Sequence, residues 1–202
     1  EAIDLDASGN TYVCGYYYGN TNFGTISLNS PSNNNGFVGK IDSHGNWLWV
    51  QNIGNSNSAV CWDLDVDDGG NISITGTFEN SAILGSIYLS SYGSYDIYVA
   101  KLNTNGNWLW AKNAGSTDGD QGKGVAIDNS GNVYITGHYF DTCNMGANIL
   151  SHQGGEDWFI AKLDTNGNWV WSTELYGNHY DVGEGIDVND NGEIAVTGEF
   201  SY

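Results

Sequence analysis

The chain contains no arginine and only five lysines, against 24 acidic residues, so its formal net charge is −19. A surface of that sign repels phosphate backbones and anionic lipids, which excludes nucleic acid as a partner. Two interpretations of the acidity remain: solubility of a secreted protein, or a surface that binds cations.

Cysteine and long apolar runs are also scarce. The three cysteines, Cys14, Cys61 and Cys143, occupy unrelated places in the repeat described below, so they do not indicate a disulfide framework. No apolar run approaches the roughly 18 residues of a membrane span, so we expect no membrane insertion. No signal peptide precedes the strand-like segment at Glu1, and we expect any targeting segment to lie outside this sequence.

Helical periodicity is missing as well. Apolar residues instead alternate with polar ones, as in NVYITGHYF at 132–140. The 29 glycines and the single proline, with frequent Asn, Ser and Thr, suit short strands joined by tight turns. The sequence therefore predicts an all-β protein.

One stretch recurs at intervals of 61 residues: GKIDSHGNWLW at 39–49, AKLNTNGNWLW at 100–110 and AKLDTNGNWVW at 161–171. This is internal duplication. In the third copy the pattern predicts four antiparallel strands, at 124–128, 133–140, 157–164 and 169–175, with a variable segment between the second and the third. A four-stranded antiparallel sheet repeated along a chain is typical of β-propeller blades.

The period divides one repeat domain, 1–202, into blades at 1–61, 62–122 and 123–183 and a half blade at 184–202. Propellers close with about four to eight blades, so three and a half leave unsatisfied faces. We expect as partners either further blades of the same longer chain or other copies of this chain. An open arc of stacked blades is the third arrangement.

Each copy of the repeated stretch ends in a Trp-x-Trp pair on the predicted fourth strand. Alternation would put both indoles of a pair on one face, where they would pack against the neighbouring blade. An exposed aromatic ladder that stacks on sugar rings is the alternative. The residues are Trp47, Trp49, Trp108, Trp110, Trp169 and Trp171.

Three of the five lysines, Lys40, Lys101 and Lys162, share one repeat position. A catalytic lysine would not be expected three times, so we interpret them as structural inter-blade residues. Each ammonium is expected to pair with a carboxylate on an adjacent first strand. The candidate partners are Asp4, Asp65 and Asp187.

Calcium is the one cofactor that the sequence suggests. The stretch DVNDNG at 187–192 fits the opening of a calcium loop, DLDASG and DVDDGG approach it, and all lack a matched downstream Glu. Since hairpin turns explain the same stretches, a chain without a cofactor is the competing interpretation. The candidate ligands are Asp4, Asp6, Asp65, Asp67, Asp187, Asn189 and Asn191, with Asp120 and Asp181 as further oxygen donors.

No catalytic motif occurs, and we assign no catalytic residue. The histidines are scattered and are expected in loops or at the surface: His44, His138, His152 and His179. The sequence therefore predicts a non-enzymatic module. The alternative is a carbohydrate-binding or glycan-active propeller, with its site on variable loops or in blades beyond this sequence.

The cadence GVAIDNSGNVYITG at 124–137, followed by DWFIAKLDTNGNWVW at 157–171, resembles the bacterial SBBP-type β-propeller repeat. That family occurs in large secreted and cell-surface proteins, many of them in Bacteroidota that use type IX secretion. The resemblance covers nearly the whole chain and implies a propeller at an extracellular or cell-surface location. With the variable loops, it leads us to expect a module for binding, adhesion or surface assembly, with a glycan or a protein as ligand.

Overall fold

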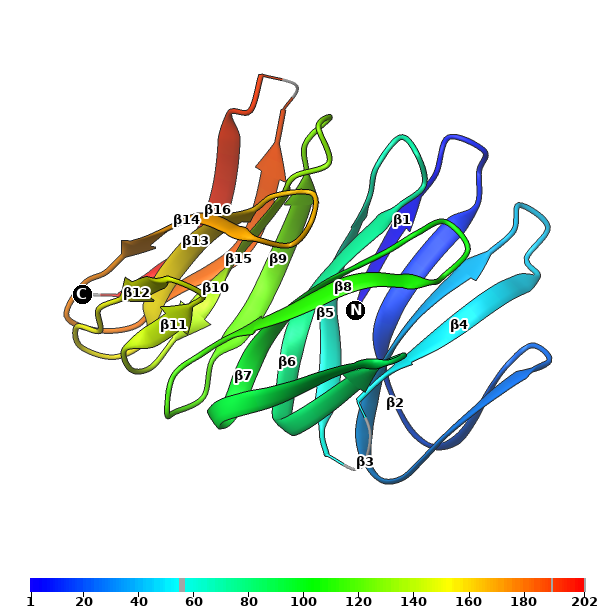
Figure 1. The fold of residues 1–202 in the computed structure, drawn as a ribbon, viewed down its shortest axis with the longest axis horizontal. Coiled ribbons are helices and arrows are strands. Elements are labelled where there is room, and N and C mark those ends of the chain that lie inside the picture. Colours follow the sequence, from blue (N-terminus) through cyan, green and yellow to red (C-terminus); the bar gives the residue numbers. More distant parts are fainter. Residues whose placement is uncertain (55–56, 190, 202) are drawn as a thin grey trace.

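The structure, a computed structural model, describes residues 1–54, 57–189 and 191–201, and every regular element in these ranges is a β-strand. The strands form three four-stranded antiparallel sheets, a two-stranded sheet at the C-terminal side, and one small separate hairpin (Figure 1). The predicted all-β class with four antiparallel strands per repeat is confirmed.

The first sheet contains β1 (Ala2–Leu5), β2 (Thr11–Phe23), β3 (Ile26–Ile41) and β4 (Trp47–Ile53). The second contains β5 (Ala59–Val66), β6 (Ile72–Leu84), β7 (Ile87–Leu102) and β8 (Trp108–Ala114). The third contains β9 (Gln121–Ile127), β10 (Val133–Tyr139), β13 (Asp157–Leu163) and β14 (Trp169–Leu175). The small hairpin is β11 (Cys143–Met145) with β12 (Asn148–Leu150), and the fourth sheet is β15 (Asp181–Val188) with β16 (Ile194–Phe200).

The divisions between sheets fall slightly earlier than the sequence period suggests. The predicted boundaries after residues 61, 122 and 183 lie inside β5, β9 and β15. The 61-residue period gives the length of one repeat but not the residue at which a sheet begins. Each hydrogen-bonded sheet begins with its first strand, directly after the connection from the preceding sheet. Each sheet therefore begins with its first strand, a few residues before the predicted boundary.

Tight turns close one edge of the sheets, which we call the turn edge. In the first of them the Asp6 carboxylate accepts the N–H groups of Ser8 and Asn10, while Gly9 takes φ +77°. This is the Asx-turn chemistry expected of the DASGN and NTNGN stretches, because a left-handed residue closes the hairpin with a bulge. The opposite edge carries the connections from one sheet to the next, and we call it the connection edge.

From the connection edge of each four-stranded sheet a hairpin extends between the second and third strands. We call these hairpins the arms: residues 19–30, 80–91 and 141–152. The first two bend at Gly19 and Asn80, which have φ +70° and +55° and adjoin register shifts in the ladder. The arms account for the variable segment that lengthens each repeat.

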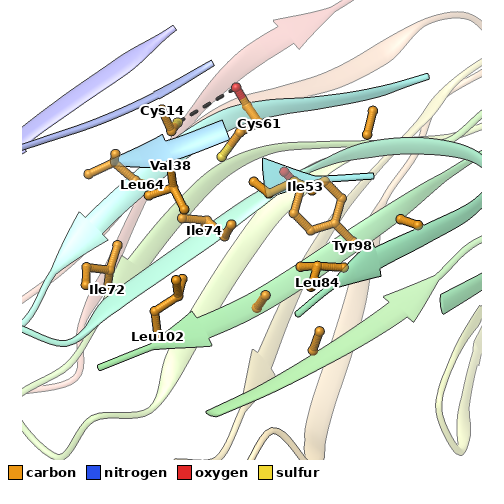
Figure 2. Packing of buried hydrophobic residues seen from close by; sticks show 14 of the residues in the cluster. Cys14, Val38, Ile53, Cys61, Leu64, Ile72, Ile74, Leu84, Tyr98 and Leu102 are labelled. Carbon is orange, nitrogen blue, oxygen red and sulfur yellow. Dashed lines mark hydrogen bonds between the residues drawn. The ribbon is translucent and has the colours of Figure 1, made fainter. Parts of the chain in front are cut away.

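Successive sheets share their cores. One cluster joins the first and second sheets, with Val38 and Ile53 facing Leu64, Ile74 and other residues of the second sheet (Figure 2). In its upper part the thiol of Cys14 points at the carbonyl oxygen of Cys61, 3.8 Å away. A second cluster joins the second and third sheets in the same way. All three cysteines are free and buried within these clusters.

The first strands of the sheets, β1, β5, β9 and β15, follow one another as neighbours and form the inner side of the array (Figure 1). The fourth strands β4, β8 and β14 lie away from that side (Figure 1). Among the described residues, no helix is long and apolar enough to cross a membrane.

Candidate functional site

The tryptophan pairs lie beside a β-bulge that the sequence pattern conceals. Ile41 is opposite Trp47 and Lys40 is opposite Trp49, so Leu48 is an extra residue in β4. The same shift makes Leu109 and Val170 the extra residues of β8 and β14. Adjacent residues of β3 point to opposite faces, and so do the two indoles opposite them. The prediction that both rings of a pair share one face was therefore wrong.

The two rings of each pair have different partners. The first packs on its own sheet: Trp47 lies against Phe23 in the first arm, with ring centroids 5.0 Å apart. The tip glycines of the second and third arms lie against Trp108 and Trp169 in the same way. Trp108 and Trp169 also pack against the cores that successive sheets share. Trp47 contacts the arm and strands of its own sheet.

The second ring of the pair reaches the neighbouring sheet. The indole nitrogen of Trp49 donates to the carbonyl oxygen of Thr104 at 3.2 Å, and that of Trp110 donates to Thr165 at 3.0 Å. Both acceptors lie in turns of the following sheet. Trp171 packs on Tyr134 of its own sheet, as Trp49 packs on Tyr12. A buried indole covers about 150–250 Å², worth roughly 4–6 kcal/mol of gross transfer free energy, so these contacts join sheet to sheet.

The three repeated lysines do form ion pairs, but not with the expected partners. Lys40 lies 3.2 Å from Asp6, and Lys101 and Lys162 lie 3.7 and 3.6 Å from Asp67 and Asp128. Each partner opens the tight turn of the same sheet, and Asp6 and Asp67 lie two residues beyond the candidates Asp4 and Asp65. Lys40 and Lys101 also donate to the next sheet, at Thr104 Oγ1 (3.1 Å) and the Gly131 carbonyl (3.0 Å).

The candidates Asp4 and Asp65 serve a different contact. The Asp4 carboxylate accepts the N–H of Val66, and the Asp65 carboxylate accepts that of Ile127, each on the next inner strand. Asp63 accepts the N–H of Val125 likewise. Inner strands are therefore bridged by carboxylates, and burial raises the pKa of both Asp63 and Asp65 to about 6. Within the described residues, the corresponding carboxylate of Asp187 accepts the N–H of its neighbour Val188 and none from another inner strand.

The proposed calcium loops are closed by protein donors. The Asp6 oxygens accept Asn10 and Tyr12 and face the Lys40 ammonium, and Asp67 holds Asn71 and Lys101 in the same way. Asn189 accepts the N–H groups of Asn191 and Glu193. A cavity of about 570 Å³ opens beside Asp65, Asp67 and Asp187 at the turn edge. Within the ranges that the structure describes, no three His, Cys, Asp or Glu side chains are grouped to hold a metal ion.

The connection edge carries a second set of bulges, one in each complete inner strand. Register shifts make Trp62, Lys123 and Glu184 the extra residues of β5, β9 and β15. A bulge re-aims the side chain that it carries, and bulges often stand beside functional sites. We call these three residues the inner row. An aromatic ring, an ammonium and a carboxylate thus occupy equivalent places.

The inner row forms a connected group with side chains from two further segments. Lys123 Nζ lies 4.3 Å from the centre of the Trp62 ring, whose indole nitrogen donates to Thr77 Oγ1. His138 on β10 faces Glu156, with 3.9 Å between Nε2 and Oε2. The group therefore combines stacking, cationic and anionic chemistry on one surface.

His138 was expected in a loop or at the surface, but it is a strand residue with only 5% of its surface exposed. Burial, with the nearby Lys123 charge, lowers the pKa of His138 to about 4, so the imidazole is neutral at pH 7. Burial raises the pKa of Glu156, and Glu184 adds to that shift. His44 and His179 are exposed, as expected, and His152 is half-buried beside Asp157.

The fourth-strand bulges provide an internal comparison. Their extra residues Leu48, Leu109 and Val170 are all aliphatic and about half exposed, at 51%, 50% and 53%. We call them the outer row. Both rows thus lie at β-bulges, but the outer row is aliphatic throughout, whereas the inner row has an aromatic, a cationic and an anionic side chain. A purely structural role explains the uniform row but gives no reason for the difference in the inner row.

Buried aspartates brace the loops of the connection edge. Asp120 accepts the N–H and hydroxyl of Ser116 and the N–H of Phe140, and Asp96 accepts the N–H groups of Tyr92 and Gly93. Burial raises the pKa of Asp96 to about 6 and that of Asp120 to about 7. Asp120, predicted as an oxygen donor in a loop, therefore organises that loop.

Sequence reasoning missed the inner row, although a signal was present. Positions 62, 123 and 184 are 61 residues apart and differ in chemistry, and glycines flank two of them, in GKG and GEG. A varying residue between small neighbours inside a repeated strand indicates a bulge that displays a side chain.

Comparison with known proteins agrees with this architecture. The family model of the SBBP β-propeller repeat matches residues 109–138, from β8 into β10. The chain is also similar to an uncharacterized WD repeat-containing protein of Acanthamoeba polyphaga mimivirus, with 26% identity over 266 aligned residues. That alignment covers 100% of this chain but 19% of the viral protein. The resemblance to the SBBP-type repeat is confirmed over the matched residues, and the four-stranded sheets are those of β-propeller blades. This architecture fits a binding or scaffold module.

Proposed function

We propose that the chain is a non-enzymatic, extracellular β-propeller repeat module that binds a ligand at its connection edge for adhesion or surface assembly. The observation that carries this proposal is the inner row, where one bulge geometry presents Trp62, Lys123 and Glu184. The joints between sheets repeat, whereas the displayed side chains differ. Contacts that repeat from sheet to sheet indicate a scaffold, and side chains that differ at equivalent positions indicate a binding surface.

The extracellular location is supported by the SBBP-type match and by the acidic surface, with its net charge of −19. A bacterial source and export by type IX secretion belong to the same proposal. Free cysteines fit either compartment, because all three are buried in cores and carry no disulfide.

Glycan binding is the second candidate, and the exposed tyrosines favour it. Rings of this kind stack on sugar faces while their hydroxyls bond in water. Five of them are at least 40% exposed: Tyr16 within β2, Tyr92 and Tyr95 within β7, and Tyr176 and Tyr180 in the connection between β14 and β15. A glycan-active enzyme is part of this alternative. The carboxylates of such an enzyme would be Glu184 of the inner row and Glu156 beside it.

The test measures binding of the labelled chain to a glycan array and to intact bacterial cells. A triple variant of the inner row, Trp62→Ser, Lys123→Ser and Glu184→Ser, should bind at least about tenfold more weakly. The matched control carries Leu48→Ser, Leu109→Ser and Val170→Ser in the outer row and should bind like the parent. Equal binding by both variants would contradict the proposal, and release of reducing sugar from an array glycan would show an enzyme instead.

A further inference from the structure

The second sheet departs from the repeat at one buried position. Tyr12 on β2 and Tyr134 on β10 share a repeat position, and the corresponding residue on β6 is Ser73. Ser73 is fully buried, and within the described residues its hydroxyl has no hydrogen-bond partner. A buried hydroxyl without a partner is unfavourable, so the packing of the fold gives no reason for a serine here.

In the first and third sheets the tyrosine supports the ion pair of the tight turn. The Tyr134 hydroxyl donates to Asp128 at 3.1 Å and accepts from the Lys162 ammonium at 2.6 Å. That ammonium also lies 4.6 Å from the centre of the Tyr134 ring. The Tyr12 hydroxyl donates to Asp6 in the same way, at 3.2 Å. Hydrogen bonds to charged groups are the stronger ones, so the phenol is an integral part of these two turns.

The ion pair of the second sheet lacks this phenol. Lys101 and Asp67 are 3.7 Å apart, and the side chain of a serine on β6 is too short to reach them. Burial lowers the pKa of Lys101, whereas the pKa of Lys162 is raised, chiefly by its hydrogen bond with Tyr134. The carboxylate and the ammonium that a tyrosine hydroxyl links in the other two sheets are therefore not linked by one here.

The cavity of about 570 Å³ at the turn edge opens at this place. Asp67 and Lys101 line it, and so does Thr165. Thr165 is the equivalent of Thr104, whose hydroxyl lies 3.4 Å from that of Tyr12. The three groups that would surround a phenol hydroxyl thus all belong to the lining. The lining also includes three aliphatic side chains: Val66, Leu109 and Ile127. Apolar walls with a few convergent polar groups, at this volume, are typical of small-molecule sites.

The rest of the charged lining is acidic. Among the described residues around the cavity, Lys101 is the one cation, and it faces an excess of carboxylates. Burial raises the pKa of Asp65 to about 6, which still leaves it mainly ionised at neutral pH. Such a lining attracts positive charge and repels negative charge. The carboxylates besides Asp67 are those of Asp65, Asp68, Asp128 and Asp187.

We propose that this cavity binds a small phenol that carries an ammonium group. The hydroxyl of the ligand donates to Asp67 and accepts from Lys101, as the Tyr134 hydroxyl does with the ion pair of the third sheet. Its ring lies against the aliphatic side chains, and its ammonium lies among the carboxylates of Asp65 and Asp187. The site is at the edge opposite the inner row and does not depend on the proposed function.

The test measures binding of tyramine to the intact chain at neutral pH by isothermal titration calorimetry. Tyramine should bind saturably with a Kd below about 1 mM and should raise Tm. Phenethylamine, which lacks the hydroxyl, should bind at least about tenfold more weakly, because it leaves Asp67 and Lys101 without that partner. 4-Hydroxyphenylacetate, with a carboxylate in place of the ammonium, should not bind up to about 10 mM. Absence of tyramine binding up to about 10 mM, or equal binding of either analogue, would overturn the proposal.

Two pairs of variants locate the bound ligand. Ser73→Tyr supplies the phenol from the chain itself and should abolish tyramine binding, whereas Ser73→Ala should bind tyramine like the parent. Asp67→Asn should weaken binding at least about tenfold. It should still fold, because Asn189 opens the last turn with the same amide. Asp6→Asn, the same change in the first sheet, should leave binding unchanged. Tyramine binding that is equal in Asp67→Asn and Asp6→Asn, or that persists in a folded Ser73→Tyr variant, would contradict the assignment.

Discussion

The indole nitrogen of Trp110 donates to the main-chain carbonyl of Thr165, 3.0 Å away, and ties β8 to a turn of the following sheet. The same contact joins Trp49 to Thr104 one repeat earlier. These paired contacts define how one sheet registers on the next, and the first two predictions concern them.

Trp110→Ala should destabilise the fold by about 3–5 kcal/mol, because it empties a site that is 91% buried and leaves the Thr165 carbonyl without its donor. Urea unfolding followed by circular dichroism measures the change. Leu109→Ala, the adjacent outer-row residue, is the control and should cost less than about 1 kcal/mol. A similar loss in both variants would show that Trp110 is not a joint.

Gly106→Ala should be more destabilising than Gly45→Ala. Both glycines close equivalent turns with positive φ, +76° and +87°, so the backbone strain is shared. A Cβ at Gly106 would lie 2.7 Å from the Trp49 ring, whereas nothing lies within 4 Å of one at Gly45. The difference in unfolding free energy, about 1–3 kcal/mol, isolates the overpacking of the indole. Equal losses would mean that the ring moves aside freely.

Lys101→Met should destabilise the protein by about 2–4 kcal/mol, because it leaves the half-buried Asp67 without its counter-ion and the Gly131 carbonyl without its donor. Burial lowers the pKa of Lys101, and the Asp67 charge opposes that shift. Adding Asp67→Asn should recover part of the loss, since Asn189 opens the last turn with an amide. Chemical denaturation of Lys112→Met provides the reference, with an expected change under about 0.5 kcal/mol.

Stability should fall as pH rises from about 5 to 8. The pKa values of Asp63, Asp65 and Asp96 are raised to about 6 and that of Asp120 to about 7. Between the unfolded value near 3.8 and these values the folded state holds more protons, so unfolding becomes easier with increasing pH. We expect Tm to drop on the order of 5–10 °C, as measured by calorimetry.

One group works against this trend, and one substitution tests it. The pKa of His138 is lowered to about 4, so this residue adds stability as pH rises between about 4 and 6.5. Asp120→Asn removes the carboxyl whose pKa is highest and should flatten the decline between pH 6 and 8. A Tm that rises between pH 6 and 8 in the parent chain would contradict the raised pKa of Asp120.

The strands were predictable wherever local chemistry alone decides them. The fourth strand of the third sheet, predicted at 169–175, is observed as Trp169–Leu175, because a glycine turn and alternation fix both ends. The first strand of that sheet, predicted at 124–128, begins earlier, at Gln121. Its bulge at Lys123 interrupts the alternation that would have revealed the true start.

The site was harder to predict, because its geometry depends on register. One inserted residue at Leu48 sends the two indoles of a pair to opposite faces, and a sequence read at i and i+2 shows no sign of it. The lysine partners were misjudged for the same reason. In the sequence Asp6 and Asp67 have the pattern of turn residues. Only the folded turns bring their carboxylates close to the ammonium groups of Lys40 and Lys101.

The acceptors of Trp49 and Trp110 are main-chain carbonyls, Thr104 O and Thr165 O, which every amino acid provides. The indole hydrogen bond itself therefore does not depend on the side chain at the acceptor position, whereas Gly106 and Gly167 of the same turns leave room for the rings. Unequal recombination that adds or deletes whole units would then create junctions that already fit. A lineage carrying this architecture can change its length in single steps.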